Sequence, residues 1–231
     1  MRRPLLATFA ALAAITALAG PATDAAAQRR AAAVQDWTRV AARTPEGGFR
    51  IGSPDARIKL VEYLSTTCGH CAAFSRESAA RLIPVHVRSG RVSVEYRNYY
   101  LNGLDVAAAL LSRCASPAGY FAMTHELLAT QATWTARIQS VPAARRPQLQ
   151  AMAPLQLTGE LITILGLDAV GQRHGIGPAA RRQCLTQANL DRLEQLHDQG
   201  ARAGVQGTPT FFINGAIQNV NTWAEIEPRL Q

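Results

Sequence analysis

Apolar and polar residues alternate in two segments of the first half of the chain, and each segment predicts a β-strand. The residues IKLVEYL at 58–64 and RVSVEYRNY at 91–99 have this two-residue period, which places every second side chain on the same face of a sheet. Between them, residues 69–89 carry apolar side chains at helical spacing, and Pro84 predicts a kink in that helix. The residues GGFRI at 47–51 predict a shorter extended piece before the first strand.

The second half has a different pattern, because residues 103–203 contain only helix-like spacing, interrupted at SPAG, SVPAARRP and GIGPAA. The residues TPTFFINGAIQNV then predict two short strands about an Asn-Gly turn, the strongest local signal for a β-hairpin. NTWAEIEPRL predicts a final helix capped by Asn221 or Thr222. The expected order is strand, helix, strand, a block of helices, a hairpin and a helix, which makes an α/β protein.

The N-terminal segment predicts a signal peptide. Arg2 and Arg3 precede a mostly apolar run of about fifteen residues, and small residues ending at Ala27 provide an A-x-A cleavage site. This run is shorter than the roughly 20 residues that a membrane span needs. We therefore expect residues 1–27 to be removed on export, and the mature protein to reside in the periplasm.

The chain is basic, with a net charge of +8 at pH 7. Lys59 is its only lysine, and the arginines occur singly or in pairs without interleaved aromatic residues. Nucleic-acid-binding proteins usually concentrate their basic residues on one face or in one stripe. We therefore interpret the charge as a solvated surface and expect no nucleic-acid partner.

Cys68 and Cys71 form a CGHC motif in the sequence STTCGHCAAFS, and three chemistries are open to it. A structural zinc site normally needs four ligands, whereas only Cys68, His70 and Cys71 cluster here, without a second paired motif. A structural disulfide would also fit the spacing. Redox catalysis fits best, because Cys68 falls between a strand and a helix, where unpaired N–H groups and the helix dipole stabilise a thiolate. His70 adds a donor or, when protonated, a positive charge, and Cys71 can resolve a mixed disulfide.

One carboxylate interrupts the apolar face of the first predicted strand. Glu62 shares that face with Ile58, Leu60 and Leu64. At an edge the carboxylate would reach solvent, whereas burial would raise its pKa because burial disfavours the charged form. The alternation alone leaves both interpretations open.

The strand–helix order, CGHC at the head of the first helix and GTPTFFING before the hairpin resemble the thioredoxin fold. The long helical insertion and the signal peptide resemble the DsbA branch, which consists of secreted thiol–disulfide oxidoreductases. The resemblance runs from about Gly48 to the C-terminus. It implies a thioredoxin-like fold with an inserted all-helical domain. Its parts would be an N-terminal extension with a short strand (28–56), a thioredoxin-like domain (57–102 and 204–231) and a helical insertion (103–203).

The resemblance also implies a role for each motif residue. Cys68 matches the exposed nucleophile of the family and Cys71 the buried resolving cysteine. Glu62 matches a buried acid that relays a proton to or from the resolving thiol. Pro209 matches a proline whose preceding peptide bond is cis, and Thr208 would offer its backbone to pair with an extended substrate.

Two features differ from the best-known oxidases of this branch. Those proteins have proline after the first cysteine, whereas Gly69 gives a CGHC motif similar to that of protein disulfide isomerases, and Thr208 before the proline is also isomerase-like. Reduction potentials are about −120 mV for DsbA and about −180 mV for protein disulfide isomerase. We therefore expect an oxidant of intermediate strength that can both donate and reshuffle disulfides.

The resemblance implies a monomeric dithiol oxidase that donates its Cys68–Cys71 disulfide to exported proteins with free cysteines. It implies a quinone-linked membrane partner for reoxidation, and neither a cofactor nor a metal. Two alternatives stay open. One is an isomerase or reductase that is kept reduced, and the other is a periplasmic metal carrier or holdase with Cys68, His70 and Cys71 as soft ligands.

Cys114 and Cys184 lie in the predicted helical block. An even number of cysteines in an oxidising compartment favours a disulfide between them. The alternative is two buried thiols that pack as small apolar side chains. A disulfide would close a loop of about 70 residues and would stabilise the protein by roughly 4 kcal/mol in the chain-entropy model.

Overall fold

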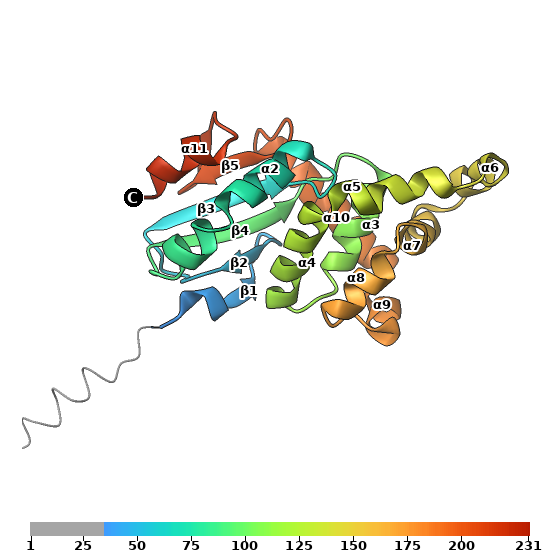
Figure 1. Cartoon of the computed structure of the whole chain (residues 1–231), viewed down its shortest axis with the longest axis horizontal. Helices are drawn as coiled ribbons and strands as arrows, with labels where there is room; N and C mark the ends of the chain where they lie inside the picture. The colour runs from blue at the N-terminus through green and yellow to red at the C-terminus, as the bar shows by residue number, and fades with distance from the viewer. Residues whose placement is uncertain (1–34) are drawn as a thin grey trace, which may run out of the picture. The chain divides into compact units, whose positions relative to one another are not determined.

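Six strands form one mixed sheet in the order β1-β2-β4-β3-β5-β6 (Figure 1). The computed structural model describes residues 35–231, so the predicted signal peptide, residues 1–27, lies outside the described residues. The strands are β1 (Ala41–Arg43), β2 (Phe49–Ile51), β3 (Ile58–Leu64), β4 (Val92–Asn98), β5 (Thr210–Ile213) and β6 (Ala216–Gln218).

The two strands predicted from alternation are confirmed and lie side by side. β3 and β4 pair in parallel, with Glu62 opposite Tyr96. β5 pairs antiparallel with the other edge of β3 and places Phe211 opposite Glu62. Glu62 therefore lies in a central strand with a partner on each side, and the edge interpretation does not apply.

The predicted Asn-Gly hairpin is also confirmed. Asn214 and Gly215 have φ values of 51° and 84°, and positive φ at both central residues is what a tight turn between twisted strands requires. Beyond the hairpin, the Glu225 carboxylate accepts hydrogen bonds from the N–H and hydroxyl of Thr222 at 3.2 and 2.6 Å. Thr222, rather than Asn221, therefore caps the final helix.

Helices α3 to α10 occupy the segment between β4 and β5, as predicted (Figure 1). The α-helices are α2 (Gly69–Ser78), α3 (Gly103–Ser112), α4 (Pro117–Ala129), α5 (Gln131–Thr135), α6 (Arg146–Gln150), α7 (Pro154–Ile164), α8 (Leu167–Arg173), α9 (Pro178–Cys184), α10 (Gln187–Arg202) and α11 (Trp223–Ile226). Shorter elements are the 3₁₀-helices η1 (Trp37–Arg39), η3 (Ala136–Ser140), η4 (Ala143–Arg145) and η5 (Glu227–Leu230), and the π-helix η2 (Leu82–Val87). Within residues 35–231, no helix has both the length and the apolar character needed to cross a membrane.

Two local expectations are wrong. Residues 69–89 do not form one helix kinked at Pro84, because α2 ends at Ser78 and the separate π-helix η2 contains Pro84. Proline constrains its own position and the residue directly before it, whereas α2 ends six residues before Pro84, so Pro84 does not by itself account for the break. The N-terminal extension also supplies two strands, β1 and β2, where the sequence indicated one. β1 is only three residues long and has no buried residue, so it leaves no alternation to detect.

The apolar side chains form two main cores. The first lies between the sheet and the helices α2, α4 and α11, and includes Leu60, Leu64, Phe74, Phe121, Phe211 and Ile226. The second lies among helices of the insertion, and includes Ala107, Leu111, Leu127, Ile162 and Leu167. The rings of Phe49 in β2 and Tyr120 in α4 stack with their centroids 3.7 Å apart. Helix α4 therefore contributes to both cores and fixes the insertion to the sheet.

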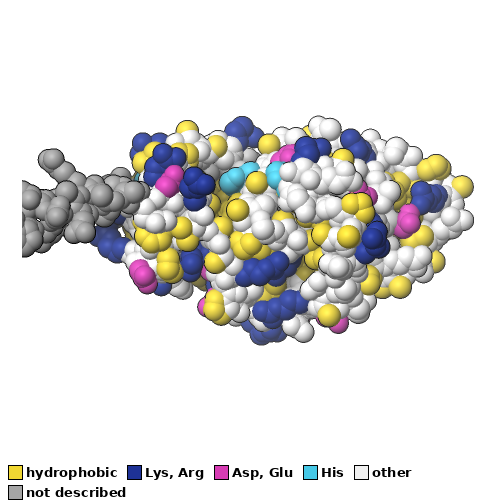
Figure 2. Space-filling model, turned by 90° about the horizontal axis from the view of Figure 1, so that it is seen from below, with side chains coloured by type: hydrophobic (Ala, Val, Ile, Leu, Met, Phe, Trp, Pro, Cys, Tyr) yellow, Lys and Arg dark blue, Asp and Glu magenta, His cyan; other side chains and the backbone are white. Residues whose placement is uncertain are grey.

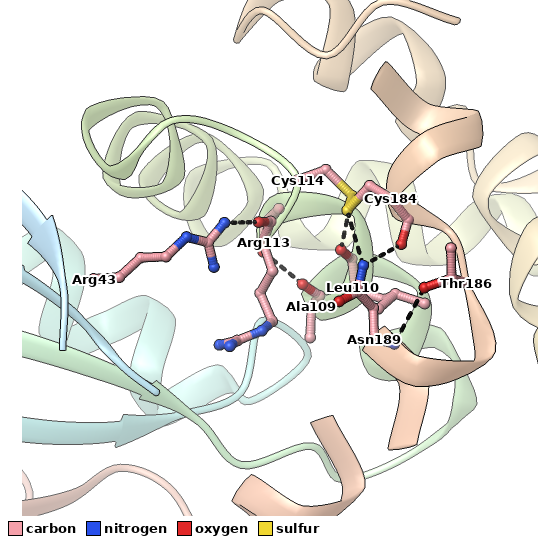
Figure 3. Close-up of a disulfide and its surroundings, with 9 residues drawn as sticks. Arg43, Ala109, Leu110, Arg113, Cys114, Cys184, Thr186 and Asn189 are labelled. Atoms are coloured by element: carbon pink, nitrogen blue, oxygen red, sulfur yellow. Dashed lines mark hydrogen bonds between the residues drawn. A yellow bond between two sulfur atoms is a disulfide. The ribbon is translucent and has the colours of Figure 1, made fainter. Parts of the chain in front are cut away.

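A disulfide joins Cys114, which follows α3, to Cys184 at the end of α9, 70 residues later in the chain (Figure 3). The Asn189 side chain donates a hydrogen bond to the Cys184 carbonyl oxygen at 2.6 Å. The crosslink thus ties the last part of the insertion to its first helix.

Candidate active site

The connection from β3 to α2 places Cys68 at the start of a helix. β3 ends at Leu64, and Cys68 is the N-cap residue of α2, with an extended backbone. The Ser65 hydroxyl accepts a hydrogen bond from the Thr67 N–H at 3.0 Å and closes the turn before the cysteine. Because the first N–H groups of a helix have no acceptor inside it, they are available to the Cys68 sulfur.

The helical insertion holds this turn from the side. The buried Asp105 carboxylate in α3 accepts hydrogen bonds from the N–H and hydroxyl of Thr66 at 2.9 and 2.6 Å, and from the N–H of Leu101 at 3.1 Å. Gln131 in α5 donates through Nε2 to the carbonyl oxygens of Thr66 and Cys68, at 2.8 and 3.0 Å. No sequence motif marks either residue, because only the fold brings the insertion to the turn.

Hydrogen bonds lower the pKa of Cys68 to about 5. The largest contribution comes from the Cys71 thiol, which donates to the Cys68 sulfur; burial acts in the opposite direction. The Thr208 side chain and the backbone N–H groups of Cys71 and His70 lower the pKa further. A free cysteine has a pKa of about 8.5, so Cys68 is a thiolate at neutral pH.

The Thr208–Pro209 peptide bond is cis and lies beside Cys68. Cys68 Sγ lies 3.1 Å from the Thr208 carbonyl oxygen and donates a hydrogen bond to it when the thiol is protonated. The Thr208 hydroxyl is buried and has no hydrogen-bond partner among residues 35–231, so it can donate to the sulfur once the sulfur has lost its proton. A shallow groove of about 530 Å³ is lined by Thr208, Pro209 and Val220. Cys68 does not line the groove, but Thr208, whose carbonyl oxygen contacts the Cys68 sulfur, does.

Cys71 and Glu62 form the buried half of the site. Cys71 is 0% exposed, and burial raises its pKa, as do its hydrogen bond to Cys68 and the charge of Glu62. Glu62 is 2% exposed, and burial raises its pKa to about 8, with the charge of Cys68 as a second cause. The site therefore combines a charged sulfur with a neutral thiol and a carboxyl group that titrates near neutral pH.

Two expectations about the CGHC motif need correction. Cys68 is only 7% exposed, so it is not the exposed nucleophile that the resemblance implied, although it is more accessible than Cys71. Its hydrogen bond to Thr208 shows that the cis-proline loop packs against it. The His70 side chain is exposed and makes no hydrogen bond within the described residues, so His70 acts on Cys68 through its backbone N–H instead.

In the described part of the chain, no group of three or more His, Cys, Asp or Glu side chains has the geometry to hold a metal ion. Cys68, His70 and Cys71 are close in sequence, but the two sulfurs are buried and the imidazole is exposed. The metal-carrier alternative therefore gains no support from the arrangement of these side chains.

Basic side chains are dispersed over the face that Figure 2 shows, in separate groups with uncharged surface between them. Several arginines of the chain pair with carboxylates, including Arg81 with Glu227 at 2.6 Å and Arg181 with Asp168 at 2.8 Å. This distribution agrees with the interpretation of the net charge as a solvated surface.

The match to the family described as Thioredoxin covers residues 44–231, so the chain belongs to the thioredoxin family. It is similar to a solved protein-disulfide isomerase from Novosphingobium aromaticivorans, with a TM-score of 0.71, 26% identity, and coverage of 79% of this chain and 96% of that one. Wolbachia pipientis α-DsbA1 shares the fold, with a TM-score of 0.60, 19% identity, and coverage of 78% and 87%. These likenesses confirm the predicted thioredoxin-like fold of DsbA type with a helical insertion.

Curated relatives carry the name "Putative protein-disulfide oxidoreductase". The protein of Rickettsia conorii is 24% identical over 180 residues, which cover 77% of this chain and 57% of that protein. The protein of Rickettsia bellii is 25% identical over 186 residues, which cover 79% and 62%. The chain thus spans about three fifths of the length of these relatives.

The turn before Cys68 should depend on Asp105. Replacing Asp105 by Ala leaves the buried N–H and hydroxyl of Thr66 without their acceptor, and each unsatisfied buried donor costs about 1–3 kcal/mol. We expect the free energy of unfolding in urea to fall by roughly 2–4 kcal/mol in the reduced protein. Asp105→Asn keeps one acceptor oxygen and should lose less. Equal stability of Asp105→Ala and the unaltered protein would show that the turn does not need this carboxylate.

Proposed function

We propose that this protein is a thiol–disulfide oxidoreductase that exchanges disulfides through Cys68 and Cys71. The proposal rests on the pKa values of the two cysteines of the motif, which shift in opposite directions. The pKa of Cys68 is lowered to about 5, and that of Cys71 is raised. A low-pKa sulfur is a good leaving group, and it is ionised at neutral pH. Membership of the thioredoxin family and the 26% identity to a protein-disulfide isomerase support the same conclusion.

In the oxidising direction, the Cys68–Cys71 disulfide is the oxidant. A substrate thiolate attacks the Cys68 sulfur, the Cys68–Cys71 bond breaks, and a mixed disulfide forms between the substrate and Cys68. Cys71 leaves with the electron pair and takes up a proton. A second substrate thiolate then attacks the first substrate sulfur and expels Cys68 as a thiolate, so the substrate gains a disulfide and the enzyme becomes a dithiol. The hydrogen bonds at the start of α2 stabilise the expelled thiolate.

Glu62 supplies or accepts the proton of Cys71. Buried ionised groups are unfavourable, so Cys71 needs a proton partner that is also buried. Burial raises the pKa of Glu62 to about 8, and the charge of Glu62 is one cause of the raised pKa of Cys71, which supports this pairing. A partner whose pKa lies near the operating pH is the most effective in proton transfer. In the reverse reaction Glu62 accepts the Cys71 proton as that sulfur attacks the mixed disulfide.

Thr208 and Pro209 bind the substrate chain beside Cys68. The Thr208 carbonyl oxygen lies 3.1 Å from the Cys68 sulfur, so a substrate backbone that pairs with Thr208 brings its own cysteine to the same place. The adjacent groove of about 530 Å³ is open enough for a chain without a fixed sequence. The substrates we propose are therefore exported proteins with free cysteines in extended or incompletely folded segments.

We assign the net direction to oxidation, because the stabilised Cys68 thiolate favours the dithiol form of the enzyme and makes its disulfide reactive. An isomerase or reductase remains the second candidate. Thr208 before the cis proline, the CGHC motif and the likeness to a protein-disulfide isomerase favour it. Thiol trapping of Cys68 and Cys71 in the cell envelope separates the two, since an oxidase is held in the disulfide form and an isomerase in the dithiol form.

We place this activity in the periplasm, with removal of residues 1–27 on export. The sequence pattern of that segment supports export, and the Cys114–Cys184 disulfide fits an oxidising compartment. A monomeric enzyme of this kind needs an electron acceptor after each turnover, and we propose a quinone-linked membrane partner for that role.

The assignment of the two cysteines can be tested by trapping. Oxidised protein mixed with a peptide that carries two thiols should form one peptide disulfide per chain. Reduced Cys71→Ser mixed with the disulfide form of the same peptide should accumulate a mixed disulfide at Cys68, because the Cys68 thiolate attacks the peptide disulfide, expels one peptide thiolate and meets no resolving sulfur on the enzyme. Mass spectrometry of the non-reduced protein measures both products. Cys68→Ser is the matched control and should capture no peptide. Equal capture by both variants would refute the assignment of Cys68 as the nucleophile.

Glu62→Gln tests the proton relay. The amide keeps the shape of the side chain but cannot accept the proton, so resolution of the mixed disulfide by Cys71 should slow by about tenfold or more, while the first attack by Cys68 stays nearly unchanged. Stopped-flow kinetics of the reduced protein with a disulfide-linked peptide resolves the two steps. Glu77→Gln, at an exposed position of α2, is the control for a lost carboxylate. A folded Glu62→Gln protein that resolves at the original rate would remove Glu62 from the mechanism.

A further inference from the structure

A cavity of about 390 Å³ lies beside the Cys114–Cys184 disulfide, and three arginines line it. Arg43 is the last residue of β1, Arg113 follows α3, and Arg192 lies in α10. No Asp or Glu is among the lining residues. We refer to this cavity as the arginine pocket; Figure 3 shows Arg43 and Arg113 next to the disulfide.

The three arginines share one cavity, and none of them has a carboxylate partner among the residues that the structure describes. Arg81, Arg173 and Arg181 each form an ion pair with Glu or Asp. Within residues 35–231, none of the three pocket arginines lies within 4.0 Å of a carboxylate oxygen. Their positive charges are therefore not neutralised by an acidic side chain of the described structure.

Neutral acceptors hold two of these guanidinium groups in place. Arg43 donates to the Arg113 carbonyl oxygen at 2.6 Å (Figure 3), and Arg113 donates to the Gly47 carbonyl oxygen at 3.0 Å and to Asn98 Oδ1 at 3.2 Å. Both guanidinium groups also lie over the Phe49 ring, at 4.6 and 5.3 Å from its centroid. These contacts orient the two side chains without cancelling their charge.

The guanidinium group of Arg192 lies close to where a side chain at position 47 would be, which favours glycine at that position. A Cβ atom on Gly47 would lie 3.0 Å from Nη2 of Arg192 and 2.5 Å from Cδ2 of Leu196, and the φ of +91° is unfavourable for other residues. Glycine therefore lets Arg192 approach the same loop whose carbonyl oxygen accepts a bond from Arg113. The loop brings the two arginines together from different helices.

The pocket concentrates like charges at a partly buried place. Burial lowers the pKa of Arg113, and the charges of Arg43 and Arg192 lower it further, while Tyr120 acts in the opposite direction. Arg113 also lies at the C-terminal end of α3, where the helix dipole is negative and offsets part of the repulsion. An anion in the pocket would offset the rest of the repulsion between the arginines.

We propose that Arg43, Arg113 and Arg192 form a binding site for a phosphate group, either free or carried by a larger molecule. Guanidinium groups present forked donors that match the oxygens of phosphate. A doubly charged group with several oxygens can contact three arginines at once, whereas one carboxylate has only two oxygens. The exposed Asn189 side chain at the rim already bonds to the Cys184 carbonyl oxygen and keeps this side of the pocket in place.

The arginine pocket is separate from the active site. Helix α3 is about 15 Å long, from its ten residues and a rise of 1.5 Å per residue. Asp105 near its first turn holds the active-site turn, and Arg113 follows its last turn. Phosphate binding therefore does not require Cys68 or Cys71, and the proposal stands independently of the redox activity.

Isothermal titration of the full chain with inorganic phosphate, at fixed ionic strength and with chloride as the balancing anion, tests the site. We expect one phosphate per chain, and binding weaker by about tenfold in Arg43→Gln and in Arg192→Gln, because each change removes a charge-assisted hydrogen bond. Arg182→Gln in α9 removes an exposed arginine outside the pocket and is the matched control, which should bind like the unaltered protein. Arg113 is left intact because its bonds to Gly47 and Asn98 are structural.

Two further arms identify the source of the phosphate group and guard against misfolding. Glycerol phosphate represents a soluble monoester, and phosphatidic acid vesicles, compared with phosphatidylcholine vesicles, represent a monoester on a lipid. The site is supported if any of these probes binds, if Arg43→Gln and Arg192→Gln weaken that binding, and if Arg182→Gln leaves it unchanged. A rise in melting temperature with phosphate that is lost in the two pocket variants supports it as well. If no probe binds, or if all three variants bind equally, the proposal is overturned.

Discussion

The proposed chemistry depends on one stabilised charge, the thiolate of Cys68. Cys68 is the N-cap residue of α2, where backbone N–H groups lack acceptors inside the helix, and those of Cys71 and His70 lower the pKa of the Cys68 thiol. The Cys71 thiol, one turn further along the same helix, is the largest cause of the lowered pKa of Cys68. The rest of the site positions this sulfur: Asp105 and Gln131 hold the turn before it, and Thr208 packs against it from the cis-proline loop.

The same arrangement explains why the two cysteines are not equivalent. Cys71 shares the helix start, but it faces the core, where burial opposes ionisation and Glu62 adds a nearby acid. Glu62 itself is held in the central strand β3 between Tyr96 and Phe211, so it cannot reach solvent by moving to an edge. Burial at this position costs stability when the carboxylate is charged. The proposed role in proton transfer would account for a carboxylate in a strand position that an aliphatic residue could fill.

Much of the fold could be predicted from local pattern, and the failures have physical causes. Alternation located β3 and β4, and the Asn-Gly pair located the β5–β6 hairpin, because these signals depend only on neighbouring residues. The sequence did not predict β1, because three residues are too few to show an alternating pattern. It predicted a helix kinked at Pro84, whereas the helix α2 ends before Pro84 and a separate π-helix contains that residue. Cys68 and Cys71 were found through their spacing, whereas Asp105, Gln131 and the arginine pocket join residues far apart in the chain. No periodicity in the sequence can show such contacts.

The most direct test of the central claim is the pKa of Cys68 in the reduced protein, followed by the ultraviolet absorbance of its thiolate as the pH is changed. Folding lowers this pKa, so the stabilisation of the reduced form relative to the oxidised form is fully present above about pH 8.5 and is lost as the pH falls through about 5. The account predicts that one thiolate titrates with a midpoint near 5, while Cys71 remains protonated at neutral pH. A midpoint near the free-cysteine value of about 8.5 would contradict it.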